Sequence, residues 1–307
     1  MSIEMPTEKL TIRASSVGQI MTNPVGKSNY EKWTEATQSL EADTLRYEAI
    51  ANKATKTAEK LAEKLVSLKR VIDELEPVKD QRDISESAKT YLVNLFVSMM
   101  YDRKKDIVTP AIAKGLAVEE ASISLYNLVK GTKAEKNTKR FYNEFLEGEP
   151  DLLFEELPLN EQVLENTVVD IKSSSDIFTY HKVKILGKYD NDYWWQLQSY
   201  MDLTGCDHAV LAYCLTDTPE IMIEDAKRRL AWQMGLIDPF QNETWLEAAA
   251  DMDKQMTYRD IPLTQRVHEI YIPRDQEAID RIHTRVKECR QWMDRVFDNI
   301  KKTLKYA

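Results

Sequence analysis

The pattern of apolar and polar positions divides the chain into long helices and a few short strands. Between about residues 30 and 76, apolar residues recur in steps of three and four, which predicts a coiled coil or a long helical hairpin that stops before Pro77. This stripe consists of Tyr47, Ala51, Ala54, Ala58, Leu61, Leu65, Leu68, Ile72 and Leu75. A second heptad stripe lies in a predicted helix at about 275–304 and consists of Ile279, Ile282, Val286, Cys289, Met293, Val296 and Ile300. Further helices are predicted at about 84–104, 111–130 and 190–204.

The strands are predicted from short β-branched and apolar runs. GEPDLLFEEL and ENTVVDIKSS flank the turn-rich LPLNEQ, and HAVLAYCL and VHEIYIP follow later in the chain. The segment TIRASSVGQIMT, residues 11 to 22, indicates a short entry strand and then a helix that Ser15 or Ser16 would cap. The order of these elements predicts an α/β fold in which helices surround a small mixed sheet.

Composition fits a globular protein, because 43% of the 307 residues are hydrophobic and 30% are charged. No run approaches the roughly 20 apolar residues that a membrane span needs, and MSIEMPTEKL lacks the features of a signal peptide. We therefore expect a cytoplasmic protein, in the host cytoplasm if a phage encodes it. The three cysteines form no CxxC pair and the four histidines are scattered, so neither a zinc site nor a disulfide framework is expected.

Local charge departs from the net charge of −9, which does not suit a general polyanion binder. One basic cluster consists of Lys130, Lys133, Lys136, Lys139 and Arg140, and a second of Lys182, Lys184 and Lys188. Such clusters are often only solvated surface, but phosphate contacts need local rather than net charge. Both clusters flank the acidic residues that are the candidate catalytic residues.

The stretch TVVDIKSSSD places a carboxylate and an ammonium two residues apart in an apolar run. In a strand, Val168, Asp170 and Lys172 share one face, which leaves the opposite face to pack into the core. A surface ion pair is the simplest interpretation of Asp170 and Lys172 taken alone. The surrounding acids change this interpretation, since several carboxylates at one strand edge repel each other unless a divalent cation neutralises them. Oxygen ligands of this kind indicate Mg²⁺ or Mn²⁺.

Four motifs occur in a fixed order: Gly115-xxx-Glu119, Gly148-Glu-Pro-Asp151, Val169-Asp-Ile-Lys172 and Gln196-xxx-Tyr200. This order resembles the PD-(D/E)XK nucleases, and most closely the lambda-exonuclease-like (YqaJ-type) viral recombinase family. The resemblance covers roughly 11–25, 111–214 and 268–300. It implies a restriction-endonuclease-like core in a single nuclease domain spanning residues 1–307. The heptad segment at about 30–76 and the segment 217–265 are then insertions, and the helix at 275–304 closes the chain.

The resemblance also implies roles for individual residues. Asp151 and Asp170, with the Ile171 carbonyl and Glu119, would hold the metal, and Lys172 would orient the attacking water. Gln196 would hold the lysine, the water or a phosphate. Contacts with nucleic acid are expected from Ser15, Ser16, Ser173, Lys182, Lys184, Lys188 and Tyr200. No clear counterpart is evident for the arginine that accompanies the serine in the terminal-phosphate pocket of the family, for which Arg13 and Lys9 are the candidates.

Two classes of function follow from these residues. The first is a Mg²⁺-dependent DNA nuclease, an exonuclease acting on linear double-stranded DNA in phage-type recombination or replication. The second is a non-catalytic nucleic-acid-binding or assembly protein on the same fold. The complete set of two acids and a lysine favours the first, because a binding protein has no need of it. A single-strand annealing protein and further copies of the chain are candidate partners, and no membrane is expected.

Overall fold

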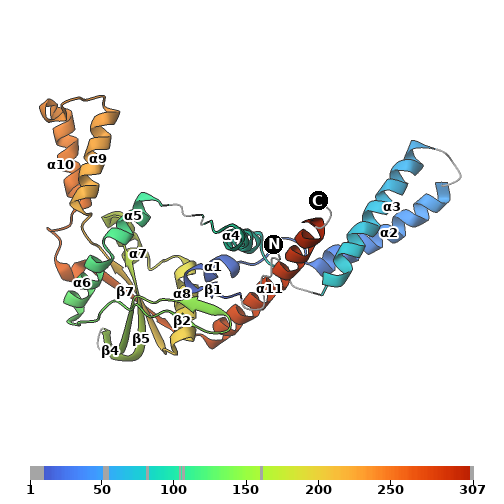
Figure 1. Cartoon of the computed structure of the whole chain (residues 1–307), viewed down its shortest axis with the longest axis horizontal. Helices are drawn as coiled ribbons and strands as arrows, with labels where there is room; N and C mark the ends of the chain where they lie inside the picture. The colour runs from blue at the N-terminus through green and yellow to red at the C-terminus, as the bar shows by residue number, and fades with distance from the viewer. Residues whose placement is uncertain are drawn as a thin grey trace. The chain divides into compact units, whose positions relative to one another are not determined.

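The computed structural model describes residues 10–50, 55–80, 83–103, 105, 108–159 and 162–304. The chain divides into two compact units (Figure 1). One unit comprises Met1–Met21 and Phe96–Val286, and the other comprises Thr22–Leu95 and Lys287–Ala307. Lys9, Ala51 and Ala54, which entered the predictions above, lie outside the described residues.

A four-stranded mixed sheet forms the centre of the first unit. Its strands, in spatial order, are β4 (Leu152–Leu159), β5 (Gln162–Ser173), β6 (His208–Cys214) and β7 (Val267–Pro273). β5 pairs antiparallel with β4 and parallel with β6, and β7 pairs antiparallel with β6. The four strands predicted from the apolar runs, and the mixed sheet that they form, are confirmed.

A second, three-stranded sheet was not predicted. It consists of β1 (Ile12–Arg13), β3 (Leu146–Gly148) and β2 (Phe141–Tyr142), with β3 in the middle. β1 pairs parallel with β3, and Arg13 lies opposite Glu147. This pairing brings the N-terminal segment beside the turn that leads into β4.

Five helices of the first unit accompany the sheets. They are α1 (Val17–Ile20), α5 (Pro110–Ala117), α6 (Glu119–Lys130), α7 (Ile177–Leu186) and α8 (Asn191–Thr204). The prediction of one helix at 111–130 is wrong, because the backbone leaves helical geometry at Val118, where φ is −111° and ψ is 10°. The helix predicted at 190–204 is confirmed as α8, and Gly205 ends it with a φ of 76°.

The central strand β5 is buried on both faces. Val168 packs in a cluster with Leu197 and Met201 of α8, whereas Val169 packs in a second cluster with Leu125 and Tyr126 of α6. The prediction that only one face packs is therefore wrong. The face that carries Asp170 and Lys172 is covered by α8, which makes their environment much less polar than a strand surface in water.

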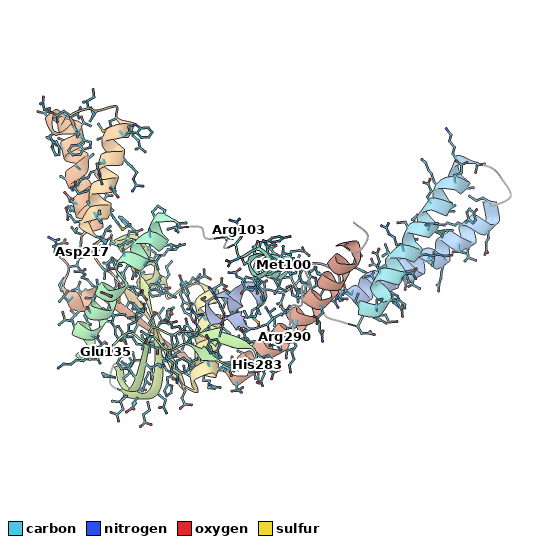
Figure 2. All side chains as sticks on the ribbon, in the orientation of Figure 1. Met100, Arg103, Glu135, Asp217, His283 and Arg290 are labelled. Carbon is cyan, nitrogen blue, oxygen red and sulfur yellow. The ribbon has the colours of Figure 1, made fainter. Side chains whose placement is uncertain are left out.

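The segment 217–265, which had no clear pattern, contains a helical hairpin. Its helices are α9 (Glu220–Gln233) and α10 (Glu243–Met256), which lie side by side in Figure 1 and have a small core around Trp245. Asp217, labelled in Figure 2, fixes the base of the hairpin, because its Oδ1 accepts hydrogen bonds from Tyr258 N at 2.8 Å and from Arg266 Nη2 at 3.0 Å.

The second unit contains the helical hairpin of α2 (Asn29–Ile50) and α3 (Lys56–Leu75). The apolar stripe of α3 is half-buried along α2, and the buried Asp43 carboxylate of α2 lies 2.7 Å from Lys64 Nζ of α3. Of the two forms that the heptad pattern allowed, the structure has the hairpin. Two further helices, α4 (Glu86–Tyr101) and α11 (Gln276–Leu304), contribute residues to both units.

The second heptad stripe lies on α11. Its residues Ile279, Ile282, Val286, Cys289 and Met293 are all buried, whereas the side chain of Ile300 lies outside the described part of the chain. Among the helices described, none has the length and apolar character required to cross a membrane.

Candidate active site

Asp170 and Lys172 form a buried ion pair on β5. Because the two residues alternate with Ile171 along the strand, their side chains share a face, and Lys172 Nζ lies 2.7 Å from Asp170 Oδ2. Asp170 is only 2% exposed. Burial by itself lowers the pKa of the Lys172 ammonium, but the Asp170 carboxylate raises it above its ordinary value. The lysine is therefore charged at neutral pH.

Asp151 reaches the same place from the neighbouring strand. The antiparallel register pairs Leu152 with Val169, so Asp151, one residue earlier, comes opposite Asp170, one residue later. The Ile171 N–H donates a hydrogen bond of 2.6 Å to Asp151 Oδ2. Burial and the nearby Asp170 carboxylate raise the pKa of Asp151 to about 7, against the weaker opposing effects of that hydrogen bond and of Lys172. The two carboxylates therefore repel each other in a poorly solvated site.

Helix α8 supplies the polar side chains that connect this site. Gln196 Oε1 accepts a hydrogen bond from Lys172 Nζ at 3.2 Å, and Gln196 Nε2 donates to Asp170 Oδ1 at 3.2 Å and to the Tyr200 hydroxyl at 3.0 Å. Gln196 and Tyr200 are one helical turn apart and lie on the same face. The Tyr200 hydroxyl in turn donates to the Glu149 carbonyl at 3.3 Å. A continuous network thus links the Gly148–Asp151 turn to both Asp170 and Lys172.

Glu119 is placed differently from the two aspartates. It is the first residue of α6, and its Oε1 lies 2.8 Å from Lys136 Nζ, a residue of the first basic cluster. Its charge contributes to the raised pKa of Asp151, so it lies close enough to act on that carboxylate. Within the described ranges, no three His, Cys, Asp or Glu side chains converge in a way that could hold a metal. The structure therefore brings Asp151 and Asp170 together, whereas the Glu119 carboxylate is paired with Lys136.

The turn before β4 packs tightly against α8, and this requires a glycine. A Cβ atom at Gly148 would lie 2.8 Å from Tyr200 Cε1 and 3.0 Å from Ala14 Cβ, closer than side chains normally approach. Gly115, by contrast, has no neighbour within 4 Å of a built Cβ atom. Nothing in the described chain explains the glycine at this motif position.

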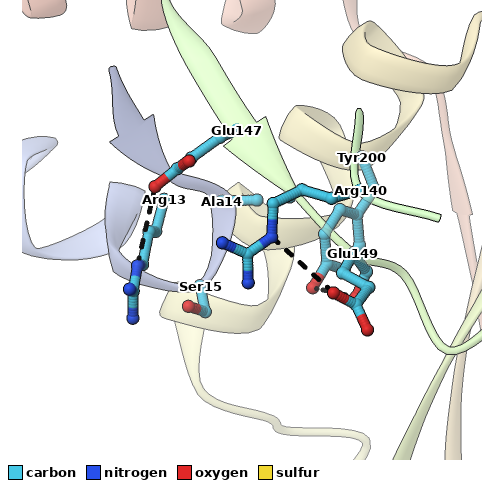
Figure 3. Close-up of a pocket in the computed structure, with 8 residues that line it drawn as sticks. Arg13, Ala14, Ser15, Arg140, Glu147, Glu149 and Tyr200 are labelled. Carbon is cyan, nitrogen blue, oxygen red and sulfur yellow. Dashed lines mark hydrogen bonds and ion pairs between the residues drawn. The ribbon is translucent and has the colours of Figure 1, made fainter. Parts of the chain in front are cut away.

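A surface pocket adjoins the acidic site (Figure 3). It is lined by Arg13, Ala14, Ser15, Arg140, Glu147, Gly148, Glu149 and Tyr200. Ser15 lies here on a 3-10 turn, Ala14–Ser16, followed by the four-residue α1, rather than at the start of a long helix. Ser16 takes the N-cap position of α1, but its side chain makes no capping hydrogen bond. The predicted strand, helix and serine at the N-cap position are therefore confirmed, but the side-chain cap is not, and Ser15 and Arg13 line one pocket.

Besides Ser15, Ser16 and Tyr200, the residues predicted to contact nucleic acid are three lysines and Ser173. Lys182, Lys184 and Lys188 are exposed on α7 and just after it. Ser173 is partly buried, and its hydroxyl lies 2.7 Å from the Ser122 hydroxyl. The lysines are free to meet a large ligand, while the Ser173 hydroxyl is already engaged inside the protein.

Several residues of the site could not be assigned a role from the sequence. The Tyr193 ring centroid lies 4.5 Å from Lys172 Nζ, which covers the ammonium with a cation–π contact. Arg140 and Lys136 were visible only as members of a basic cluster. Their pairing with Glu149 and Glu119 could not be predicted, because long ionic side chains pair across segments that no local pattern connects.

Comparison with known proteins adds evidence on the fold. No family model matches the sequence, and no curated protein matches it significantly. A phage-related exonuclease from Haemophilus somnus 129PT is similar in structure, with a TM-score of 0.56 and 22% sequence identity over 95% of this chain and 97% of that chain. The alkaline exonuclease LHK-Exo from Laribacter hongkongensis gives a TM-score of 0.48 at 15% identity, over 72% of this chain and 88% of that chain.

The match to the phage-related exonuclease covers nearly all of both chains, so it extends beyond the central sheet into the surrounding helical segments. The chain therefore has the fold of a phage-related exonuclease, as the order of its four motifs predicts.

Proposed function

We propose that this chain is a Mg²⁺- or Mn²⁺-dependent nuclease that hydrolyses phosphodiester bonds of linear double-stranded DNA as an exonuclease. The observation that carries the proposal is the meeting of Asp151, Asp170 and Lys172 where β4 pairs with β5, with the ammonium 2.7 Å from one carboxylate. The fold shared with a phage-related exonuclease supports it.

The donor atoms at this place suit a hard divalent cation. Mg²⁺ is usually held by one or two protein carboxylates, with waters and substrate phosphates completing its shell, so two aspartates are sufficient. Burial, and next the neighbouring Asp170 carboxylate, raise the pKa of Asp151, and a bound cation would offset both of these unfavourable effects on its charged form. Asp151, Asp170 and the Ile171 carbonyl would hold the ion, and Glu119 would contribute through water. When bound, the ion would stabilise negative charge on the phosphate and lower the pKa of a water.

The chain's own residues have separate tasks in this proposal. Lys172 Nζ supplies a fixed positive charge beside the reacting phosphate and orients the water by hydrogen bonding. Gln196 fixes both partners of the ion pair, since its carbonyl oxygen accepts from Lys172 and its amide donates to Asp170. Tyr200 is buried, which raises the pKa of its hydroxyl and keeps it a neutral donor and acceptor in the network.

Metal binding should stabilise the protein more at alkaline than at acidic pH. Because the pKa of Asp151 is raised to about 7 in the folded protein, from about 4 in an unfolded chain, the folded state binds more protons between these values. The free energy of unfolding contributed by Asp151 therefore falls as pH rises through this window. We expect Mn²⁺ to raise the melting temperature by roughly 3 °C more at pH 8 than at pH 5. Thermal melts with Mn²⁺ and with EDTA measure this, and Asp151→Asn is the control that should lose the difference.

DNA binding should depend on the exposed lysines on and just after α7, in spite of the acidic net charge. Replacing Lys182, Lys184 and Lys188 by Glu is expected to weaken DNA affinity by about 10-fold or more and to flatten its dependence on salt, because phosphate contacts release counterions. Fluorescence anisotropy with a labelled duplex over a range of salt concentrations measures both quantities. Unchanged affinity and salt slope would show that DNA does not contact α7.

One experiment separates a nuclease from a non-catalytic DNA-binding protein on the same fold. Linear and covalently closed duplexes, the linear one labelled at either end, are incubated with the protein in Mg²⁺ and in Ca²⁺. Release of label from the linear duplex alone, in Mg²⁺, would establish an exonuclease and its direction. Binding without cleavage in Mg²⁺ or Mn²⁺ would favour the second class. A role in phage-type recombination, with an annealing protein or further copies of the chain as partners, is part of the proposal and follows from the resemblance of the four motifs to the viral recombinase family.

A further inference from the structure

The segment 131–140 is attached to the backbone that carries Asp151. Asn137 fixes it there, because its N–H donates to the Asp151 carbonyl at 2.8 Å and its side-chain amide donates to the Pro150 carbonyl at 2.9 Å. Lys136 is the preceding residue. The two hydrogen bonds of Asn137 therefore hold Lys136 next to the acidic site.

The Lys136 ammonium pairs with an acid of that site. Its Nζ lies 2.8 Å from Glu119 Oε1. The hydrogen bond with Glu119, and next the charges of Glu119, Asp151 and Glu149, raise the pKa of the ammonium against a smaller effect of burial. Lys136 is therefore a charged internal counter-ion of the acidic site.

The two lysines of the site differ in how firmly they are held. The side chains of Lys136 and Glu119 are 41% and 35% exposed, whereas those of Lys172 and Asp170 are 22% and 3% exposed. An exposed ion pair contributes little to stability, because water solvates both partners when it opens. Opening the buried pair would leave a carboxylate without compensation. Lys136 is therefore the cation that can exchange its partner.

We infer that Lys136 couples DNA binding to metal binding, because its ammonium moves from Glu119 to a backbone phosphate of the bound strand and so frees the Glu119 carboxylate for the metal. Phosphates attract such exposed lysines, and the freed carboxylate adds an oxygen ligand, directly or through water. Each ligand then raises the affinity for the other by the same factor. The inference deepens the proposed nuclease function and rests on it for the identity of both ligands.

Calorimetric titration with Ca²⁺, which also binds through oxygen ligands, tests the inference with and without a short blunt duplex. Lys136→Met removes the ammonium and keeps the length of the side chain. Without DNA it should bind Ca²⁺ about 10-fold more tightly than the wild type, and the gain in Ca²⁺ affinity that the duplex produces should shrink by a similar factor. Lys136→Arg keeps a cation and should behave like the wild type.

A double-mutant cycle shows whether Lys136 acts through Glu119. In Glu119→Gln no carboxylate remains to be freed, so adding Lys136→Met should leave Ca²⁺ affinity unchanged. Fluorescence anisotropy should show that Lys136→Met reduces the slope of log DNA affinity against log salt by about 1, since one phosphate contact is lost. Lys27→Met, which removes an exposed pair with Glu35 in the second unit, is the matched control and should change neither quantity.

The binding and cleavage measurements distinguish failure of this inference from failure of the nuclease proposal. Unchanged Ca²⁺ affinity in Lys136→Met, or a rise that persists in the Glu119→Gln background, overturns the inference even in a protein that cuts DNA. An unchanged salt slope overturns it as well, because the ammonium then contacts no phosphate, and so does the absence of Ca²⁺ binding by every variant. The expected shifts in a protein that cuts no DNA in Mg²⁺ keep the inference and contradict the nuclease.

Discussion

Asp170→Asn is expected to reduce cleavage of linear duplex DNA by about 10³-fold or more, because it removes one of the two carboxylates that would hold the metal. Asparagine keeps the shape of the side chain but not its charge, so Mn²⁺ affinity should fall together with activity. DNA affinity should stay level or rise, since a charge that repels phosphate is gone.

The same substitution should have a second effect, on Lys172. Without the Asp170 carboxylate, burial is the dominant influence on the buried ammonium, and its pKa should fall. Calorimetric Mn²⁺ titration, a nuclease assay and circular dichroism are measured together on Asp170→Asn and on Asp207→Asn, an exposed aspartate in the turn before β6. If Asp170→Asn cleaved DNA at the wild-type rate, Asp170 and Lys172 would be only a structural ion pair. The proposed nuclease function would then lose its basis.

The central sheet could be predicted because each of its strands contains a short run of apolar residues. β5 is β-branched, is bounded by polar turns, and carries Asp170 and Lys172 two residues apart, so period-2 geometry alone places them together. Helix α8 is predicted equally well, because an aspartate stands at its start and Gly205 at its end. Its one-turn spacing correctly predicts that Gln196 and Tyr200 share a face.

The three-stranded sheet could not be predicted from the sequence, for a physical reason. Its strands have two or three residues, too few to show any period, and β1 pairs with β3 across more than a hundred residues of chain. The pocket beside the acidic site depends on that pairing, because it sets Arg13 opposite Glu147. A local pattern can therefore suggest Arg13 as an anion-binding residue, but cannot show that glutamates already neutralise the arginines around it.

The break between α5 and α6 was missed for a related reason. No glycine or proline marks Val118, which is buried by tertiary packing, and the break makes Glu119 the first residue of a new helix. The sequence suggests Glu119 as a metal ligand, and the structure places its charge near enough to Asp151 to act on that carboxylate. Its pairing with Lys136 arises from long side chains meeting in space, and this weakens its assignment as a direct metal ligand.

Lys172→Ala should separate chemistry from metal binding, because it leaves both carboxylates in place. Losing the ammonium removes a fixed positive charge beside Asp170 and the donor that would orient the water. We expect turnover to fall by about 10²-fold or more, the scale typical of a lost electrostatic or acid–base contributor. Mn²⁺ affinity should be kept or increased, because the acid pair then lacks its internal cation.

The comparison with Asp170→Asn decides whether the lysine acts on the reaction or only supports the site. Mn²⁺ titration and single-turnover cleavage are measured on Lys172→Ala, with Lys254→Ala on α10 as an exposed lysine control that should retain turnover. Tight Mn²⁺ binding with lost turnover assigns Lys172 to the chemical step. Weak Mn²⁺ binding would instead show that Lys172 maintains the geometry of Asp170 through Gln196, the residue that hydrogen bonds to both. Turnover within a few-fold of the wild type would rule out either role, because the proposed mechanism depends on the buried ammonium that lies 2.7 Å from the Asp170 carboxylate.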